Sequence, residues 1–193
     1  MAILKVARMG HPVLRAKARA VEPAEIVSPG FQALIDDLFA TMREYQGIGL
    51  AAPQVHESVR LFVAGLRTSK LTGTLSDDDE MPFIALINPV ITPVIPPGAV
   101  SPDTDTDWEG CLSIPDIRGL VERPRSISVR AFNRQGRKIE LEASGLPARV
   151  IQHETDHLDG ILFFDRMKSL DTLTFLDEYS RFHRKNDGDD DDE

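Results

Sequence analysis

The sequence predicts an α+β domain. Three observations lead to this fold class: short apolar segments read as strands, longer stretches have the residue spacing of helices, and the strands precede the last well-marked helix. With 193 residues, of which 41% are hydrophobic, the chain can bury one core of ordinary size, whereas two domains would be a tight fit. We therefore expect one folded domain over residues 1–183 and an acidic, disordered tail over residues 184–193.

The first expected helix begins at Ser28-Pro29, where an N-cap residue is followed by proline at the first helical position. Its apolar residues recur with the spacing of one buried helical face, and charged residues lie between them. Gly47 ends the pattern. The apolar stripe consists of Leu34, Ile35, Leu38, Phe39 and Met42.

Strands and loops are expected to alternate through the middle of the chain. Residues 61–64 and 85–87 are short, apolar and strand-like, and Asn88-Pro89 is expected to stop the second of these strands. The polar stretches 66–83 and 96–107 are predicted to be loops.

A β-hairpin is expected over residues 127–141. Apolar and polar residues alternate over 127–131, residues 133–136 (Asn-Arg-Gln-Gly) form a turn, and the alternation resumes at Ile139. One more helix is predicted near the C-terminus from the spacing of Leu173, Leu176, Tyr179 and Phe182.

The helix that carries most of the chemistry is expected over residues 146–160, with proline near its start and glycine past its end. It contains the sequence HETDH at residues 153–157. Because residues four apart lie on one face of a helix, His153 and His157 can reach the same metal ion. Glu154 is offset around the helix, so it can reach a water on that ion without binding the ion itself.

A catalytic metal site needs a third protein ligand beside these two, with one position left open. Of the other histidines, His11 and His56 stand alone in the sequence, and His183 lies next to the acidic tail. Cys111 has the better context, because it follows a loop and has the flexible Gly110 beside it. The alternative for a single cysteine is a small buried hydrophobic residue.

Charge and composition argue against several classes of function. The net charge is −9 and no cluster of Lys and Arg occurs, so direct nucleic-acid binding is not expected. There is no run of about 18 apolar residues to span a bilayer, and the N-terminal residues do not resemble a secretory signal. One cysteine cannot form an internal disulfide, which agrees with a reducing cytoplasm.

Three segments resemble the signature motifs of the peptide deformylases: GIGLAAPQ at residues 47–54, EGCLS at 109–113 and QHETDHLDG at 152–160. They follow one another in the order found in that family, and the resemblance extends to about residue 180. It implies antiparallel sheets packed around a central helix that carries the HExxH motif. It also implies an enzyme that removes the N-formyl group from the N-terminal formylmethionine of newly made polypeptides and releases formate.

The resemblance also implies a role for each residue of the site. Cys111, His153 and His157 correspond to the metal ligands, and Glu154 corresponds to the general acid and base. Gln54 and the backbone N–H of Leu112 correspond to the oxyanion donors. Ile48, Gly49 and Gly110 correspond to the positions whose backbone groups pair with an extended substrate. Leu146 and Val150 correspond to part of the pocket for the methionine side chain.

The implied cofactor is one Fe²⁺ per chain, with Ni²⁺ or Co²⁺ as working substitutes and Zn²⁺ often less active. Ferrous iron beside a thiolate is expected to be sensitive to oxygen. The implied partners are formyl-methionyl nascent peptides at the ribosome exit, and we expect a monomer in a bacterial-type cytoplasm. The acidic tail replaces the basic or helical extension of some members, which argues against ribosome docking through that end.

Two other functions are left open at this point. An HExxH peptidase acting on unblocked peptides would share the metal and the glutamate, but it would usually take its third ligand from a His or Glu further along the chain. A structural zinc protein or an inactive relative would need neither Glu154 nor Gln54 to hold a metal.

The neighbours of the ligands carry weaker predictions. Asp156 is expected either to pair with Arg118 or Arg123 and orient the site, or to be a solvated helix charge. Glu109 is expected to brace the cysteine loop. Trp108 is expected either to cap the rim of the cleft or simply to pack.

Overall fold

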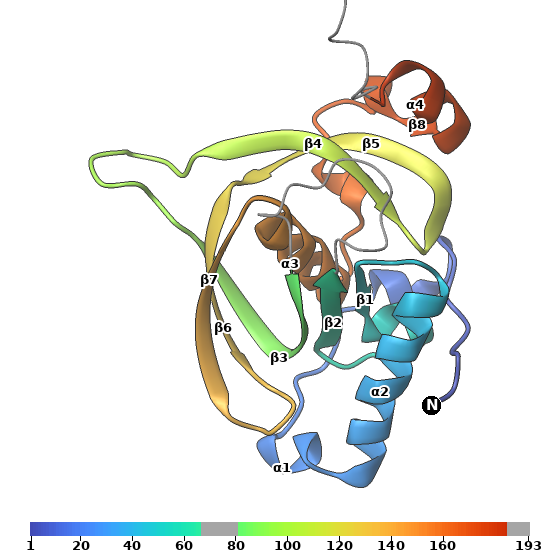
Figure 1. The fold of residues 1–193 in the computed structure, drawn as a ribbon, viewed down its shortest axis with the longest axis vertical. Helices are drawn as coiled ribbons and strands as arrows, with labels where there is room; N and C mark the ends of the chain where they lie inside the picture. Colours follow the sequence, from blue (N-terminus) through green and yellow to red (C-terminus); the bar gives the residue numbers. More distant parts are fainter. Residues whose placement is uncertain (67–80, 185–193) are drawn as a thin grey trace, which may run out of the picture.

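The computed structural model describes residues 1–66 and 81–184, and its strands form two antiparallel sheets around helix α3 (Gly145–Leu158) (Figure 1). This confirms the predicted fold class. The larger sheet has the order β1-β2-β3-β6-β7, and the smaller has the order β4-β5-β8. The strands are β1 (Gly49–Ala51), β2 (Leu61–Leu66), β3 (Met81–Pro93), β4 (Thr104–Cys111), β5 (Ile114–Pro124), β6 (Ser126–Phe132), β7 (Lys138–Ser144) and β8 (Thr174–Phe175).

The helices take up both faces of the larger sheet. Helix α2 packs on one face with α1, and α3 packs on the other, where its buried residues share a core with those of β2 and β6. The remaining helical elements are short. The helices are α1 (Pro23–Ile26), α2 (Pro29–Glu44), α4 (Leu176–Phe182), and the 3-10 turns η1 (Pro12–Arg15), η2 (Ala52–Val55), η5 (Phe163–Arg166) and η6 (Leu170–Thr172).

Helix α2 forms where the sequence predicts it. The Ser28 hydroxyl accepts a hydrogen bond from the Phe31 N–H at 3.4 Å, which caps the first turn, and Pro29 is the first helical residue. Ile35 and Leu38 from the predicted stripe are fully buried against the sheet.

Helix α3 is buried on nearly every side because it lies between the two sheets. It begins within one residue of the predicted start and ends before Gly160, whose φ of +73° suits glycine. A Cβ at Gly160 would lie 2.6 Å from the Arg15 carbonyl oxygen, so this turn also needs glycine for space. A helix in this position is held by packing on most of its faces, so side chains on it are well fixed.

The prediction that Asn88-Pro89 ends a strand is wrong, because β3 continues to Pro93. The register with β6 shifts between Ile87 and Val90, and Asn88 takes a φ of +51° at this bulge. The Asn88 side chain compensates by accepting from the Val21 N–H at 2.9 Å and donating to the Val21 carbonyl at 2.8 Å. Proline is tolerated at such a bulge because the regular ladder is already interrupted.

Both predicted loops include residues that belong to strands in the structure. Leu66 ends β2 and residues 81–83 begin β3, while residues 67–80 lie outside the described part. Residues 104–107 belong to β4, not to the loop 96–107. Their side chains are exposed, so the apolar alternation that marks a half-buried strand is absent from them.

The β4–β5 hairpin was not predicted, and it carries Cys111 at its turn. Pairing runs from Thr104–Pro124 to Cys111–Ile114, with a register shift between Glu109 and Cys111. In Figure 1 this hairpin arches over α3, which brings the cysteine to the helix.

The predicted hairpin is confirmed as β6–β7, with Phe132 opposite Lys138. The predicted C-terminal helix is shorter than expected: Leu173 precedes β8, and α4 begins only at Leu176. Of the acidic tail predicted over residues 184–193, residues 185–193 lie outside the described residues. Across residues 1–66 and 81–184 no helix is both long and apolar enough to cross a membrane.

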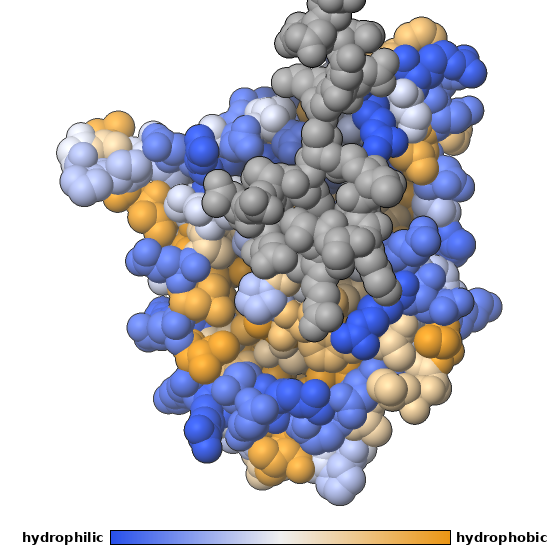
Figure 2. All heavy atoms as spheres, viewed as in Figure 1, coloured by the Kyte–Doolittle hydropathy of each residue, from blue (hydrophilic) through white to orange (hydrophobic). Residues whose placement is uncertain are grey.

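The larger sheet keeps half-buried apolar side chains on β3 and β7, among them Ile84, Ile91, Ile139 and Leu141. Figure 2 shows hydrophobic surface on this side of the molecule, bordered by hydrophilic residues.

Candidate active site and metal centre

Three potential metal ligands meet between the β4–β5 hairpin and α3. One ligand atom from each of Cys111, His153 and His157 lies within 4.8 Å of the others. The Cys111 Sγ is 3.2 Å from the Nε2 of His157, and the two imidazole rings are 5.0 Å apart. The structure therefore brings together a thiol and two imidazoles separated by more than 40 residues in the sequence.

The charges of this cluster favour a metal-binding form of the cysteine. Burial would raise the pKa of the Cys111 thiol, but the adjacent His157 and His153 hold that pKa well below its usual value. A thiolate with two imidazoles is a donor set suited to zinc or iron. The Nδ1 of His157 and the Oε2 of Glu154 are buried without a hydrogen-bond partner in the part of the chain that is described. The donor set of Cys111, His153 and His157, with the unpaired Glu154 carboxylate oxygen beside it, fits a divalent ion.

The Glu154 carboxyl lies beside the cluster and against the backbone of β1. A Cβ at Gly49 would lie 2.8 Å from the Glu154 Cδ and would overlap the carboxylate oxygen, so only glycine leaves room here. Burial raises the pKa of Glu154 to about 7. A carboxyl group that titrates near neutral pH can both take up and release a proton during a reaction.

The Gln54 side chain is buried and fixed at both ends of its amide. Its Oε1 accepts from the Ala51 N–H at 2.8 Å, which determines the orientation of the amide. Its Nε2 then points toward the cysteine, 3.4 Å from the Cys111 Sγ and 3.3 Å from the Ser113 Oγ. This places an amide donor beside the candidate metal centre.

A cavity of about 620 Å³ opens onto this cluster. Every residue assigned to the site from the sequence borders it except His157, which is buried behind the other ligands. The bordering residues from that set are Ile48, Gly49, Gln54, Gly110, Cys111, Leu112, Leu146, Val150, His153 and Glu154.

Sequence reasoning missed several residues that also line the cavity. Arg149 lies four residues before His153, so helical spacing could have placed it on the same face of α3. Arg8, Tyr45 and Leu176 come from elements far away in the sequence, and no local signal marks them. His11 and His56 lie outside the cluster, and their rings contact each other with centroids 4.8 Å apart.

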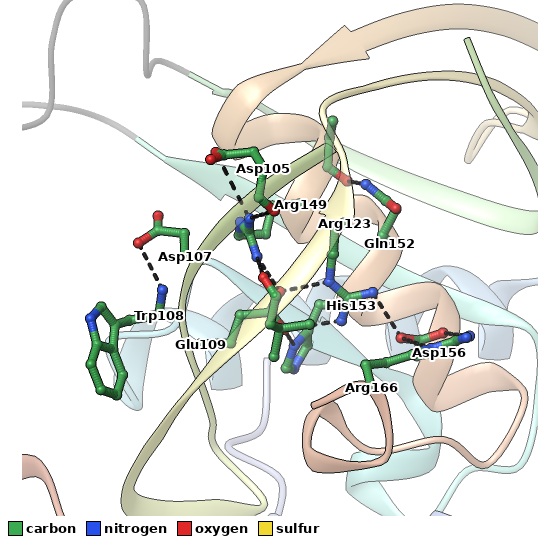
Figure 3. A network of polar contacts seen from close by, with 12 residues as sticks. Asp105, Asp107, Trp108, Glu109, Arg123, Arg149, Gln152, His153, Asp156 and Arg166 are labelled. Carbon is green, nitrogen blue, oxygen red and sulfur yellow. Dashed lines mark hydrogen bonds and ion pairs between the residues drawn. The ribbon is translucent and has the colours of Figure 1, made fainter. Parts of the chain in front are cut away.

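Behind the ligands lies a buried network of ion pairs, drawn in Figure 3. Glu109 accepts from Arg123 at 2.6 and 3.0 Å, from Arg149 at 2.9 Å, and contacts the Nδ1 of His153 at 2.9 Å. Asp156 extends the network, with Arg123 at 2.9 Å and Arg166 at 2.7 Å. The side chains of Glu109, Arg123, Arg149 and Asp156 are at most 9% exposed.

This network orients His153. Burial would raise the pKa of Glu109, but hydrogen bonds with His153 and Arg123 hold it well below its usual value, so the carboxylate is charged. A charged Glu109 accepts from the His153 Nδ1–H, which leaves the Nε2 of that ring for a metal ion. Glu109 was predicted to brace the cysteine loop; the contacts that the structure shows are with Arg123, Arg149 and His153, so bracing of the loop stays a prediction.

The two other neighbour predictions are also decided. Asp156 pairs with Arg123 as one of the two predicted partners, whereas pairing with Arg118 is wrong. Trp108 both borders the cavity and packs against α4, with its ring 5.0 Å from those of Tyr179 and His183.

Comparison with known proteins points to one family. A family model described as polypeptide deformylase matches residues 3–173. A peptide deformylase of Leptospira biflexa is 40% identical over 171 residues, which is 88% of this chain and 90% of that protein. Peptide deformylase 2 of a Nostoc species is 41% identical over 185 residues, covering 95% and 97% of the two chains.

Solved structures give the same result. A class I type b peptide deformylase from Acinetobacter baumannii, described as bound to Met-Ala-Ser, superposes with a TM-score of 0.75 at 36% identity. The match covers 86% of this chain and 99% of that one.

Proposed function

This chain belongs to the peptide deformylase family, a family of metal-dependent hydrolases that remove the N-formyl group from new polypeptides, and we propose that Cys111, His153 and His157 hold its metal ion. The observation that carries this assignment is the convergence of the three side chains at the end of a cavity that Glu154 also borders. When bound, the ion would polarise the formyl carbonyl and lower the pKa of a water molecule.

Glu154 is the general acid and base of the proposed mechanism. Its raised pKa, about 7, allows the carboxylate to take a proton from the attacking water and to return it to the departing amine nitrogen. Formate and a free methionyl N-terminus are the products. The contact with Gly49 supports this role because it holds the carboxyl at the cavity wall.

Gln54 and the backbone N–H of Leu112 are the proposed oxyanion donors. The Gln54 amide carries no proton that titrates, and its acceptor end is already occupied by Ala51, so its Nε2 remains the end that faces the reacting carbonyl. Leu112 follows Cys111 directly and lines the same cavity.

The substrate is proposed to bind as an extended chain. Backbone groups of Ile48, Gly49 and Gly110 would pair with it, and Leu146 and Val150 would contact the methionine side chain. All five residues line the cavity. The Acinetobacter baumannii relative described as bound to Met-Ala-Ser supports a peptide that begins with methionine.

Fe²⁺ is the proposed native ion, with Ni²⁺, Co²⁺ or Zn²⁺ able to occupy the same ligands. We expect activity to decline in air and a reductant or catalase to slow that decline, because ferrous iron and a thiolate are both oxidised readily. Elemental analysis of protein purified without oxygen identifies the ion. Full activity after prolonged storage in air, with iron verified, would contradict the assignment.

The cellular setting is also a proposal. We place the catalytic domain at residues 1–183 and propose that it acts as a monomer in a bacterial-type cytoplasm, on formyl-methionyl nascent peptides at the ribosome exit. Gel filtration of the full chain and co-sedimentation with translating ribosomes test these two statements.

One assay separates deformylation from peptidase activity, the alternative that the comparisons do not favour. Formate release from formyl-Met-Ala-Ser is measured beside hydrolysis of Met-Ala-Ser and of a longer unblocked peptide. We expect formate from the first peptide alone. Cleavage of the unblocked peptides without formate release would overturn the proposed function.

A further inference from the structure

The connection between β3 and β4, residues 94–103, projects from the body of the protein as an arm, at the left of Figure 1. Its two ends are held at β6 and at the residue before it. The Val94 N–H donates to the Ser126 carbonyl oxygen at 2.9 Å, and the Arg125 N–H donates to the Asp103 carbonyl oxygen at 2.9 Å. The arm therefore starts from a fixed base and extends away from the sheet.

The arm is stiff and carries exposed apolar side chains. Val100 is 99% exposed and Ile95 is 53% exposed. Three prolines, Pro96, Pro97 and Pro102, restrict the backbone between the two ends of the arm. A stiff segment loses little conformational entropy when a partner binds it. Apolar side chains held in water on such a projection indicate a contact with another molecule.

An apolar groove with a volume of about 460 Å³ lies at the opposite end of β3 from the arm. Its walls include Phe39 from α2, Phe83 and Ile84 from β3, and Ile139 from β7. All four side chains are half-buried. Excluding water from such side chains is favourable, so the groove suits an apolar segment.

The groove and the arm carry opposite charges. Arg43 borders the groove and stacks over two of its aromatic rings, with 4.8 and 5.9 Å to their centroids, and no carboxylate of residues 1–66 and 81–184 lies within ion-pair distance of it. Arg134 also borders the groove, but Asp36 neutralises it at 2.9 Å. On the arm, Asp103 is exposed and forms no ion pair in the described chain. Arg43 and Asp103 are thus complementary charges without fixed partners.

The two features also match in length. Asp36 and Arg43 both border the groove, and seven residues of helix α2 separate them by about 10 Å. Val100 and Asp103 are three residues apart, which is about 10 Å in an extended chain. An arm lying along the groove can therefore place Val100 among the apolar walls while Asp103 reaches Arg43.

Arm and groove cannot meet within one chain, because they lie at opposite ends of one strand. Phe83 is near the start of β3 and Pro93 is its last residue, and this length of strand spans about 30 Å. A two-fold axis across the middle of β3 would bring the arm of each of two copies to the groove of the other. Such an exchange occupies both arms and both grooves, so it closes at two copies.

We propose that the arm of one copy docks in the groove of a second copy and that the two copies exchange arms reciprocally. Val100 fills the apolar groove, and Asp103 pairs with Arg43. Two short arms bury less surface than a permanent dimer interface, so we expect a Kd of about 10–500 µM. Each candidate active site takes all its residues from one chain. The monomer proposed above as the catalytic unit therefore persists at nanomolar assay concentrations.

Sedimentation equilibrium of the metal-loaded full chain, from about 1 to 1000 µM, measures this association. We expect a monomer–dimer equilibrium. Val100→Asp should raise its Kd at least about tenfold, because it places a charge among apolar walls. Val27→Asp is the matched control: Val27 is 59% exposed and borders neither the arm nor the groove, so its Kd should stay unchanged.

Charge reversal tests whether the arm meets this groove. Arg43→Asp and Asp103→Arg should each raise the Kd about three- to tenfold, because each places like charges together. The double variant restores opposite charges, so its Kd should return to within about twofold of the original. Thermal unfolding of every variant verifies that it is folded.

Three results would overturn the inference: a monomer throughout the concentration range, a Kd unchanged by Val100→Asp, or no recovery in the charge-reversed double variant. Growth beyond two copies would likewise exclude the reciprocal exchange. Because association is measured without turnover, failure to release formate would overturn the proposed function and leave this inference untouched.

Discussion

Two pairs of arginines lie at or near the same cleft, and their surroundings differ. Arg123 and Arg149 are buried, and each binds the carboxylate of Glu109. Arg8 and Arg118 lie on the rim and bind no carboxylate among the described residues.

The difference follows from solvation. A charge taken out of water costs several kcal/mol unless partners replace its hydration, so the buried arginines are tied to fixed acids. Their geometry is rigid, and they position His153. The rim arginines keep their water, so they can remain unpaired and exchange that water for a ligand. Around one cleft, buried charge sets the geometry of the candidate metal site, whereas exposed charge remains free of fixed partners among the described residues.

Glu154 contrasts with both pairs of arginines, since it is a buried acid that has no cationic hydrogen-bond partner among residues 1–66 and 81–184. Replacing it by glutamine should lower the rate of formate release by about 10²- to 10⁴-fold, because the proton carrier is lost. Metal content should not change, since the three ligands remain. The exposed Glu142→Gln is the matched control and should keep full activity. Turnover at the normal rate in Glu154→Gln would show that the mechanism is wrong.

The buried network should respond as one unit. Arg123→Met leaves Glu109 and Asp156 buried with fewer partners, so unfolding free energy should fall by about 3–5 kcal/mol and metal affinity by about 10- to 100-fold. Urea unfolding and competition with a chelator measure the two effects.

A double variant tests whether the loss comes from the stranded charge. Arg123→Met combined with Glu109→Gln should be less destabilised than the sum of the two single variants, because neither buried charge is then left alone. Strict additivity would mean that the two side chains do not form one ion-pair network.

The smallest effect is expected at an exposed ion pair, that of Arg15 with Asp165. Asp165→Asn should cost less than about 1 kcal/mol, because solvent screens the pair. Partial burial would raise the pKa of Asp165, but the hydrogen bond from Arg15 holds it below its usual value. The pair therefore contributes stability above the unfolded-state pKa of about 3.9, and this contribution is lost as pH falls through the lower folded-state pKa. Thermal unfolding of both proteins at pH 7 and pH 3 should show a smaller difference at pH 3 than at pH 7.

The sequence predicted well whatever depends on neighbours along the chain. Residues 153–157 form one turn of α3, so four-residue spacing placed His153 and His157 on one face before any fold was known. The cap at Ser28 and the turn of the β6–β7 hairpin are equally local. The same local reasoning failed at Asn88-Pro89. The Asn88 side chain forms hydrogen bonds with the backbone of Val21, a distant residue, and β3 continues past Pro89.

By itself, the sequence determined the α+β class, the helix with its two imidazoles and carboxyl, and, through three motifs, the family. Only the tertiary structure decided that the β4–β5 hairpin delivers Cys111 to that helix, and which arginines are buried and paired and which remain free. The physical reason is that pairing of charges depends on burial, and burial is set by segments that are distant in the chain and meet only on folding.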